Sequence, residues 1–112
     1  MIKPINTHED FTVEVLLAED APVLVYFWAE WCGPCHNTTS ALEEVAKDYG
    51  DDVKIVSVEV DKAHELARAN QIHALPTFLL CQDGKREEIK AGAMSKSQIV
   101  NWLNNHIPGE KV

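Results

Sequence analysis

The sequence has too few cysteines, basic residues and long apolar runs for several common classes of protein. Its three cysteines, an odd number, fit poorly with a secreted domain held together by paired disulfides. Ten basic residues stand against eighteen acidic ones, and the resulting net charge of −8 argues against nucleic acid or an anionic membrane surface as the partner. No stretch approaches the ~20 apolar residues of a membrane-spanning helix. Because the first ten residues also lack the apolar run of a signal peptide, we expect a cytoplasmic protein.

The remaining composition is that of an ordinary globular protein. Hydrophobic residues make up 46% of the 112 residues and charged residues 25%, a balance typical of folded proteins. A chain of this length can bury a hydrophobic core of its own, and it leaves no room for a second domain. We therefore expect one domain over residues 1–112.

Apolar runs alternate with helical patterns along the chain, which indicates an α/β fold. The continuous apolar run at 23–29 predicts a central strand buried on both faces. Further strands are predicted at 2–5, 53–60, 77–82 and 85–91. Asp83-Gly84 predicts a two-residue hairpin between the last two of these strands.

Two long helices are predicted from apolar spacing and capping signals. The segment 33–49 is apolar at the i, i+3, i+4 and i+7 spacing of one helix face. Ser95 and Gln98 form a capping box that begins a last helix, and Pro108-Gly109 is predicted to end it.

Two shorter helices are predicted from candidate N-caps. Thr7 is expected to cap a first helix, and Asp61 a third helix that runs through Ala69. The first helix is expected to carry three apolar residues, Val13, Leu16 and Leu17. The predicted order is therefore β-α-β-α-β-α-β-β-α.

Two cysteines stand three residues apart where the strand at 23–29 meets the helix at 33–49. Side chains at i and i+3 of a helix are neighbours, so Cys32 and Cys35 can reach the geometry of a disulfide. A helix N-terminus favours a thiolate, which is the nucleophile in disulfide exchange. Cys32, nearer the helix start, is predicted to attack a substrate disulfide, and Cys35 to resolve the mixed disulfide.

The residues around the two cysteines read Phe27-Trp28-Ala29-Glu30-Trp31-Cys32-Gly33-Pro34-Cys35. Three more motifs follow at matching spacing, Ala74-Leu75-Pro76-Thr77-Phe78, Asp83-Gly84-Lys85 and Gly92-Ala93-Met94-Ser95-Lys96. Together these segments resemble the thioredoxin family over about residues 8–107. The resemblance implies the thioredoxin fold, with a five-stranded mixed sheet of order 1-3-2-4-5 flanked by four helices. It also implies that a cis peptide bond precedes Pro76.

The resemblance further implies how the protein works. Gly-Pro between the cysteines accompanies the reducing members of the family, so it implies a protein disulfide reductase. Its partners would be disulfide-containing proteins and an electron donor such as thioredoxin reductase; no metal and no other cofactor is expected, and the protein is expected to be a monomer. An apolar groove for partner polypeptide is implied at Trp31, Gly33, Pro34, Leu75, Pro76, Gly92 and Ala93.

Neutral residues replace a buried ionic pair that is common in the family. Tyr26 stands in the place of an Asp that serves the inner cysteine, and Ser57 in the place of a Lys. A tyrosine is a poor base near neutral pH, since its reference pKa is about 10. The replacement either removes a costly buried charge or slows the deprotonation of Cys35, and the two interpretations are compatible.

Three other residues allow more than one interpretation. His36, which follows the second cysteine, either tunes the thiolates or occupies a solvated helix position, and His73 lies near the same rim. Cys81, inside an apolar strand, is predicted to be a buried and inert thiol, and the alternative is a role in redox regulation.

Several other functions fit parts of the same motif. Residues 32–36 satisfy the C-x-x-C-H pattern of haem attachment, although haem proteins of that kind are helical and exported. A metal could take Cys32, Cys35, His36 and His73, although structural zinc usually needs a second ligand pair. The remaining alternatives are a disulfide isomerase or oxidant, and a non-catalytic partner-binding or chaperone module that kept only the fold.

Overall fold

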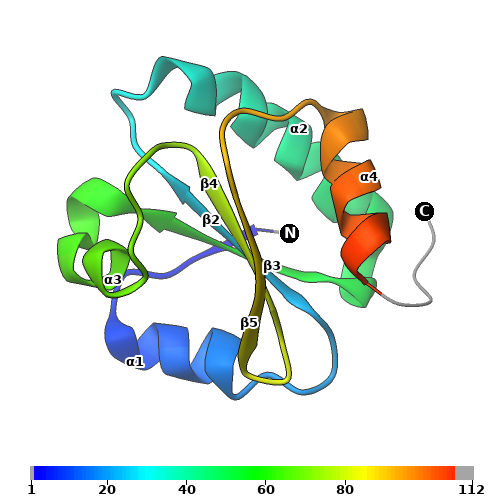
Figure 1. Ribbon diagram of the computed structural model, residues 1–112, viewed down its shortest axis with the longest axis horizontal. Coiled ribbons are helices and arrows are strands. Elements are labelled where there is room, and N and C mark those ends of the chain that lie inside the picture. Colours follow the sequence, from blue (N-terminus) through cyan, green and yellow to red (C-terminus); the bar gives the residue numbers. More distant parts are fainter. Residues whose placement is uncertain (1, 108–112) are drawn as a thin grey trace.

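A five-stranded sheet separates two layers of helices in the computed structural model, which describes residues 2–107 (Figure 1). The strands are β1 (Ile2–Pro4), β2 (Val23–Trp28), β3 (Lys54–Glu59), β4 (Thr77–Gln82) and β5 (Lys85–Ala91). The helices are α1 (His8–Phe11), α2 (Gly33–Tyr49), α3 (His64–Ala69) and α4 (Lys96–His106). A π-helical turn, η1 (Thr12–Leu16), continues α1, and two 3₁₀ turns are η2 (Gly50–Asp52) and η3 (Val60–Lys62).

The strand order is β1-β3-β2-β4-β5, which confirms the predicted thioredoxin fold. Strands β1, β3 and β2 run parallel, whereas β4 is antiparallel to β2 and β5 to β4. Helices α1 and α3 lie on one side of the sheet, and α2 and α4 on the other (Figure 1). The predicted helix 33–49 is confirmed, and so is the capping box of Ser95 and Gln98. The predicted helix end at Pro108-Gly109 lies outside the described residues.

Strand β2 is buried on both faces because its side chains alternate between two hydrophobic cores. Leu24 and Tyr26 belong to the core beneath α2 and α4. Val25 and Phe27 belong to the core beneath α1 and α3. This double burial explains the continuous apolar run in the sequence, and it gives α2 a rigid starting point at the end of β2.

The predicted Asp83-Gly84 hairpin joins β4 to β5. Asp83 has φ 52° and Gly84 has φ 77°, the paired positive values that a tight hairpin turn needs. A Cβ atom on Gly84 would stand 2.6 Å from the carbonyl oxygen of Leu16. The glycine therefore also allows the hairpin tip to approach η1.

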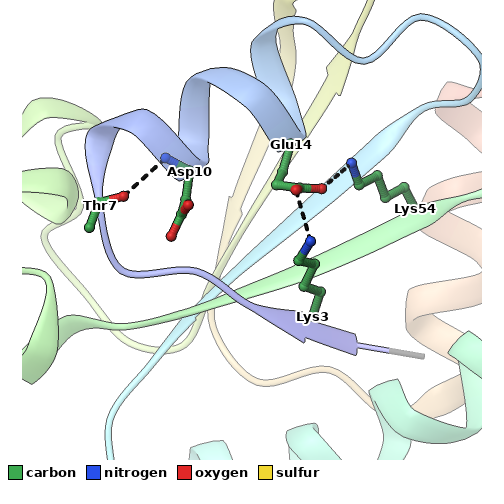
Figure 2. Close-up of polar contacts among 5 residues, drawn as sticks. All are labelled: Lys3, Thr7, Asp10, Glu14 and Lys54. Carbon is green, nitrogen blue, oxygen red and sulfur yellow. Dashed lines mark hydrogen bonds and ion pairs between the residues drawn. The ribbon is translucent and has the colours of Figure 1, made fainter.

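The first helix differs from its prediction after its N-terminus. Thr7 caps α1 as predicted, with its hydroxyl oxygen accepting from the Asp10 N–H at 3.0 Å (Figure 2). The chain then continues as the wider π-helical turn η1. As a result, the two buried residues of this segment are Phe11 and Val15, which are four residues apart. The three apolar residues predicted for this helix, Val13, Leu16 and Leu17, are exposed.

The predicted Asp61 cap of the third helix is wrong. Asp61 lies in the 3₁₀ turn η3, and α3 begins two residues after that turn, with Ala63 at the N-cap position. An alanine side chain has no oxygen to accept the orphan N–H groups of the first helical turn. The predicted end of this helix at Ala69 is correct.

The carboxylate of Glu14 in η1 forms ion pairs with the two neighbouring strands β1 and β3. The two oxygens of Glu14 lie 2.8 Å from the Lys3 ammonium of β1 and 2.5 Å from the Lys54 ammonium of β3 (Figure 2). Hydrogen bonds from these two lysines hold the pKa of the Glu14 carboxyl at about 2, below its ordinary 4.5.

This shift predicts an acid-sensitive contribution to stability. Because the pKa of Glu14 is lower in the folded chain than in the unfolded one, its contribution is present above pH 4.5 and is lost as the pH falls towards 2. Glu14→Gln is therefore expected to lower the free energy of unfolding at pH 7 and to flatten its dependence on pH between 5 and 2. Urea titrations at successive pH values measure this, with Glu43→Gln, an exposed carboxylate of α2, as the control. Equal pH slopes in Glu14→Gln and the unaltered protein would contradict the prediction.

Candidate active site

The carboxyl end of β2 leads the chain through a short loop to the N-terminus of α2. Cys32 is the N-cap residue, with an extended backbone, and Cys35 lies in the first turn of the helix. The Cys32 N–H donates to the Ala29 carbonyl at 3.2 Å, and the Cys35 N–H donates to the Cys32 carbonyl at 3.1 Å. Pro34 stands in the first turn, where its missing N–H has no intrahelical partner to lose.

The two cysteines form a disulfide, with their Cα atoms 5.3 Å apart. Cys35 is fully buried, whereas Cys32 keeps 5% of its surface exposed. Reduction of this bond would leave Cys32 at a helix N-terminus, where unpaired N–H groups and the helix dipole stabilise a thiolate. The geometry therefore suits reversible disulfide exchange, with access from solvent at Cys32.

The two cysteines pack with apolar residues from three other segments. Ala29 forms a small buried cluster with them, and Trp28, Val60 and Leu75 lie against that cluster. Sequence reasoning missed Val60 at this place, because its position follows only from the turn that η3 makes after β3.

Two recorded contacts near this cluster involve predicted groove residues. The Leu75–Pro76 peptide bond is cis, as the resemblance implied, and the Gly92 N–H donates to the Pro76 carbonyl at 2.8 Å. The chain thereby brings Leu75 against the cysteines and Gly92 against Pro76. The other predicted groove residues border these contacts as exposed chain neighbours, Trp31, Gly33, Pro34 and Ala93. The Trp31 side chain stands out among them, with 69% of its surface exposed.

Tyr26 reaches the inner cysteine from the sheet below. Its hydroxyl donates to the Cys35 carbonyl at 3.0 Å and lies 2.9 Å from the hydroxyl of Thr39. Since the Tyr26 hydroxyl donates its one hydrogen to the carbonyl, Thr39 must be the donor in the second bond. Burial raises the pKa of the Tyr26 phenol above 10, which outweighs the opposing effect of the Thr39 bond. The phenol is therefore neutral near pH 7 and cannot take a proton from Cys35.

The bonds of Tyr26 were not predicted from the sequence, although two signals pointed to them. A tyrosine inside a buried strand needs a partner for its hydroxyl. Thr39 follows Cys35 by four residues, which places both on one face of α2. Ser57 is the register neighbour of Tyr26 on β3, so the replaced pair does lie side by side.

The histidines do not join the cysteines in a metal site. Nε2 of His36 lies 2.9 Å from the Glu30 carbonyl oxygen, and His73 is exposed in the loop before Pro76. Within residues 2–107, no three His, Cys, Asp or Glu side chains come together as a group that could hold a metal ion.

The third cysteine is buried in β4, as predicted. Burial raises the pKa of the Cys81 thiol to about 11, against a smaller opposing effect of Arg86. A thiol with this pKa stays protonated near neutral pH, and a protonated thiol is a poor nucleophile.

Comparison with known proteins identifies the family to which this arrangement belongs. The family model described as Thioredoxin matches residues 3–105. The chain belongs to the thioredoxin family. It is 41% identical to a thioredoxin of Pseudomonas aeruginosa over 101 residues, which cover 90% of this chain and 93% of that protein. It is 39% identical to a thioredoxin of Rickettsia bellii over 90% of this chain and 95% of the relative, and equally identical to thioredoxin 1 of Synechococcus elongatus over 90% and 94%.

As a thioredoxin-family protein with an intact cysteine pair, the chain is a thiol–disulfide oxidoreductase that reduces protein disulfides by dithiol–disulfide exchange. Its partners are in general disulfide-bearing proteins and a reductase that returns the electrons. None of the helices within residues 2–107 is long and apolar enough to cross a membrane.

Proposed function

We propose that this thioredoxin-family protein is a general protein disulfide reductase in which Cys32 attacks the substrate and Cys35 releases it. The observation that supports this assignment is the position of the disulfide at the N-terminus of α2, with Cys32 the more exposed of the two cysteines. The helix dipole favours the thiolate at the N-cap position of Cys32.

The reaction proceeds in two exchange steps. The Cys32 thiolate attacks one sulfur of the substrate disulfide, a mixed disulfide forms, and the other substrate sulfur leaves as a thiolate that solvent protonates. Cys35 then loses its proton and attacks the Cys32 sulfur, which forms the Cys32–Cys35 disulfide and releases the second substrate thiol. Since Tyr26 is neutral, it does not take the proton of Cys35, and we assign this proton to solvent. The two electrons that the substrate receives are returned to the protein by thioredoxin reductase or a similar donor.

The substrate polypeptide docks along the exposed rim beside Cys32. Trp31 supplies a large exposed apolar side chain at this rim, and tryptophan is enriched in protein–protein interfaces. The contact of Leu75 with the cysteine cluster and the Gly92–Pro76 hydrogen bond support a groove with two walls. The docking residues are Trp31, Gly33, Pro34, Leu75, Pro76, Gly92 and Ala93.

The proposed function as a disulfide reductase also predicts the oligomeric state and the cellular compartment of the protein. A disulfide reductase needs a donor that keeps it in the dithiol form, and thiols are kept reduced in the cytoplasm. We therefore assign the protein to the cytoplasm, as a monomer that meets its substrates and its electron donor in turn.

The midpoint potential of the disulfide tests the direction of this reaction. We expect a midpoint near the value of about −270 mV known for thioredoxin. Equilibration in thiol–disulfide buffers, followed by the fluorescence of Trp28 and Trp31 and paired with reduction of insulin disulfides, measures it. The double variant Cys32→Ser/Cys35→Ser is the control, because it can form neither the disulfide nor a mixed disulfide with the buffer at this site, and it is expected to show no transition. A midpoint of about −180 mV or higher would assign the protein to the isomerases or oxidants instead.

A further inference from the structure

We propose that His36 is a positioning residue that fastens the chain before Cys32 to the first turns of α2 and thereby stabilises the disulfide relative to the dithiol. Nε2 of His36 lies 2.9 Å from the carbonyl oxygen of Glu30. A carbonyl oxygen only accepts, so Nε2 carries the hydrogen of this bond. Both a neutral ring with its hydrogen on Nε2 and a protonated ring can donate it, so the bond persists in either charge state.

This hydrogen bond closes a loop that contains both cysteines. Glu30 stands two residues before Cys32, and His36 follows Cys35 directly. In the oxidised protein the disulfide closes a smaller loop inside the same stretch. Reduction of the disulfide opens the smaller loop. The His36–Glu30 hydrogen bond then remains as a side-chain link between the segment before Cys32 and helix α2.

The disulfide and the His36–Glu30 hydrogen bond stabilise each other. The disulfide already restrains the segment between Glu30 and the first turn of α2. The His36 hydrogen bond therefore costs less conformational entropy in the oxidised protein than in the reduced one. By thermodynamic reciprocity, the hydrogen bond must favour the disulfide over the dithiol by the same factor. It does so by keeping the two thiols close together, which raises their effective concentration.

Removal of the donor should therefore make the protein a weaker reductant. The effect is the difference between the contributions of the bond in the two states and is bounded by the net contribution of one hydrogen bond. We therefore expect His36→Ala to lower the equilibrium constant for disulfide formation by up to about fivefold, which converts to a midpoint up to about 20 mV higher. The mixed disulfide with glutathione should also become more populated at the midpoint, because the second thiol then competes less well. His36 is exposed, so the variant keeps the folded structure on which the measurement depends.

Three variants, each equilibrated with glutathione buffers and analysed by Trp fluorescence and intact mass, test the proposal. His36→Ala should show the higher midpoint, and His36→Gln, whose amide N–H has a similar reach, should restore the original value. His73→Ala, which removes an exposed imidazole of the neighbouring loop, should change neither readout. An unchanged midpoint in His36→Ala would overturn the proposal, and so would a shift in His36→Gln as large as in His36→Ala. No protein substrate takes part, so the result is independent of which disulfides the protein reduces.

Discussion

Replacement of Cys32 by Ser is expected to abolish the reduction of insulin disulfides, by at least about 10³-fold. A serine hydroxyl is scarcely ionised near neutral pH, so the variant has no nucleophile at the N-cap of α2. Cys35 cannot take over the attack, because it is fully buried beneath the rim of the site. Replacement of Cys35 should have a different result: Cys32 still attacks, but nothing releases the product, and mixed disulfides accumulate.

Turbidity of insulin in the presence of dithiothreitol measures the first effect, and non-reducing electrophoresis with a disulfide-bonded substrate measures the trapped product. Cys81→Ala is the control, since it removes the third thiol, which is buried in β4 away from the exchange chemistry. It should retain the activity of the unaltered protein. Mixed disulfides that form in Cys32→Ser but not in Cys35→Ser would reverse the assigned roles.

Replacement of Phe78 by Ala is expected to lower the free energy of unfolding by about 3–5 kcal/mol. Phe78 is fully buried in β4, and its ring centroid lies 5.2 Å from that of Tyr26 and 6.3 Å from that of Trp102. Truncation therefore opens a cavity between β2 and α4 and removes two aromatic contacts. A domain of this kind is stable by only about 5–15 kcal/mol, so the loss is a large fraction of the total.

Guanidinium unfolding of the oxidised protein measures this loss. Phe78→Leu, which keeps most of the volume, should cost less than about 1.5 kcal/mol. Ile89→Ala on the neighbouring strand β5 is the matched surface control, because Ile89 is 48% exposed, and it should change stability by about 0.5 kcal/mol or less. A loss in Phe78→Ala no larger than in Ile89→Ala would show that the cavity closes.

The cavity in Phe78→Ala should also affect the active site. Phe78 packs against the ring of Tyr26, whose hydroxyl donates to the Cys35 carbonyl. A looser Tyr26 ring holds the first turn of α2 less firmly, so the aromatic core and the position of the inner cysteine are coupled.

The sequence by itself determined the elements whose signals are local. Strand β2 followed from a run that is apolar on both faces, the β4–β5 hairpin from Asp83-Gly84, and α2 from one apolar helical face. The cysteine pair was equally local, because two residues three apart at a strand-to-helix junction are neighbours in any fold that forms that junction. The strand order came from resemblance rather than from any pattern of residues.

Only the tertiary structure decided what lies around the pair. Leu75 and Val60 meet the cysteines because the crossovers of the sheet bring distant segments to one end of β2. The hydrogen bonds of Tyr26 and His36 depend on side-chain directions that sequence spacing leaves open. Long-range packing likewise overrode local signals in the first helix, where η1 turned Phe11 and Val15 towards the core. For the cysteine cluster and for the first helix, the deciding free energy came from burial between elements far apart in the chain, and local propensity contains no information about such contacts.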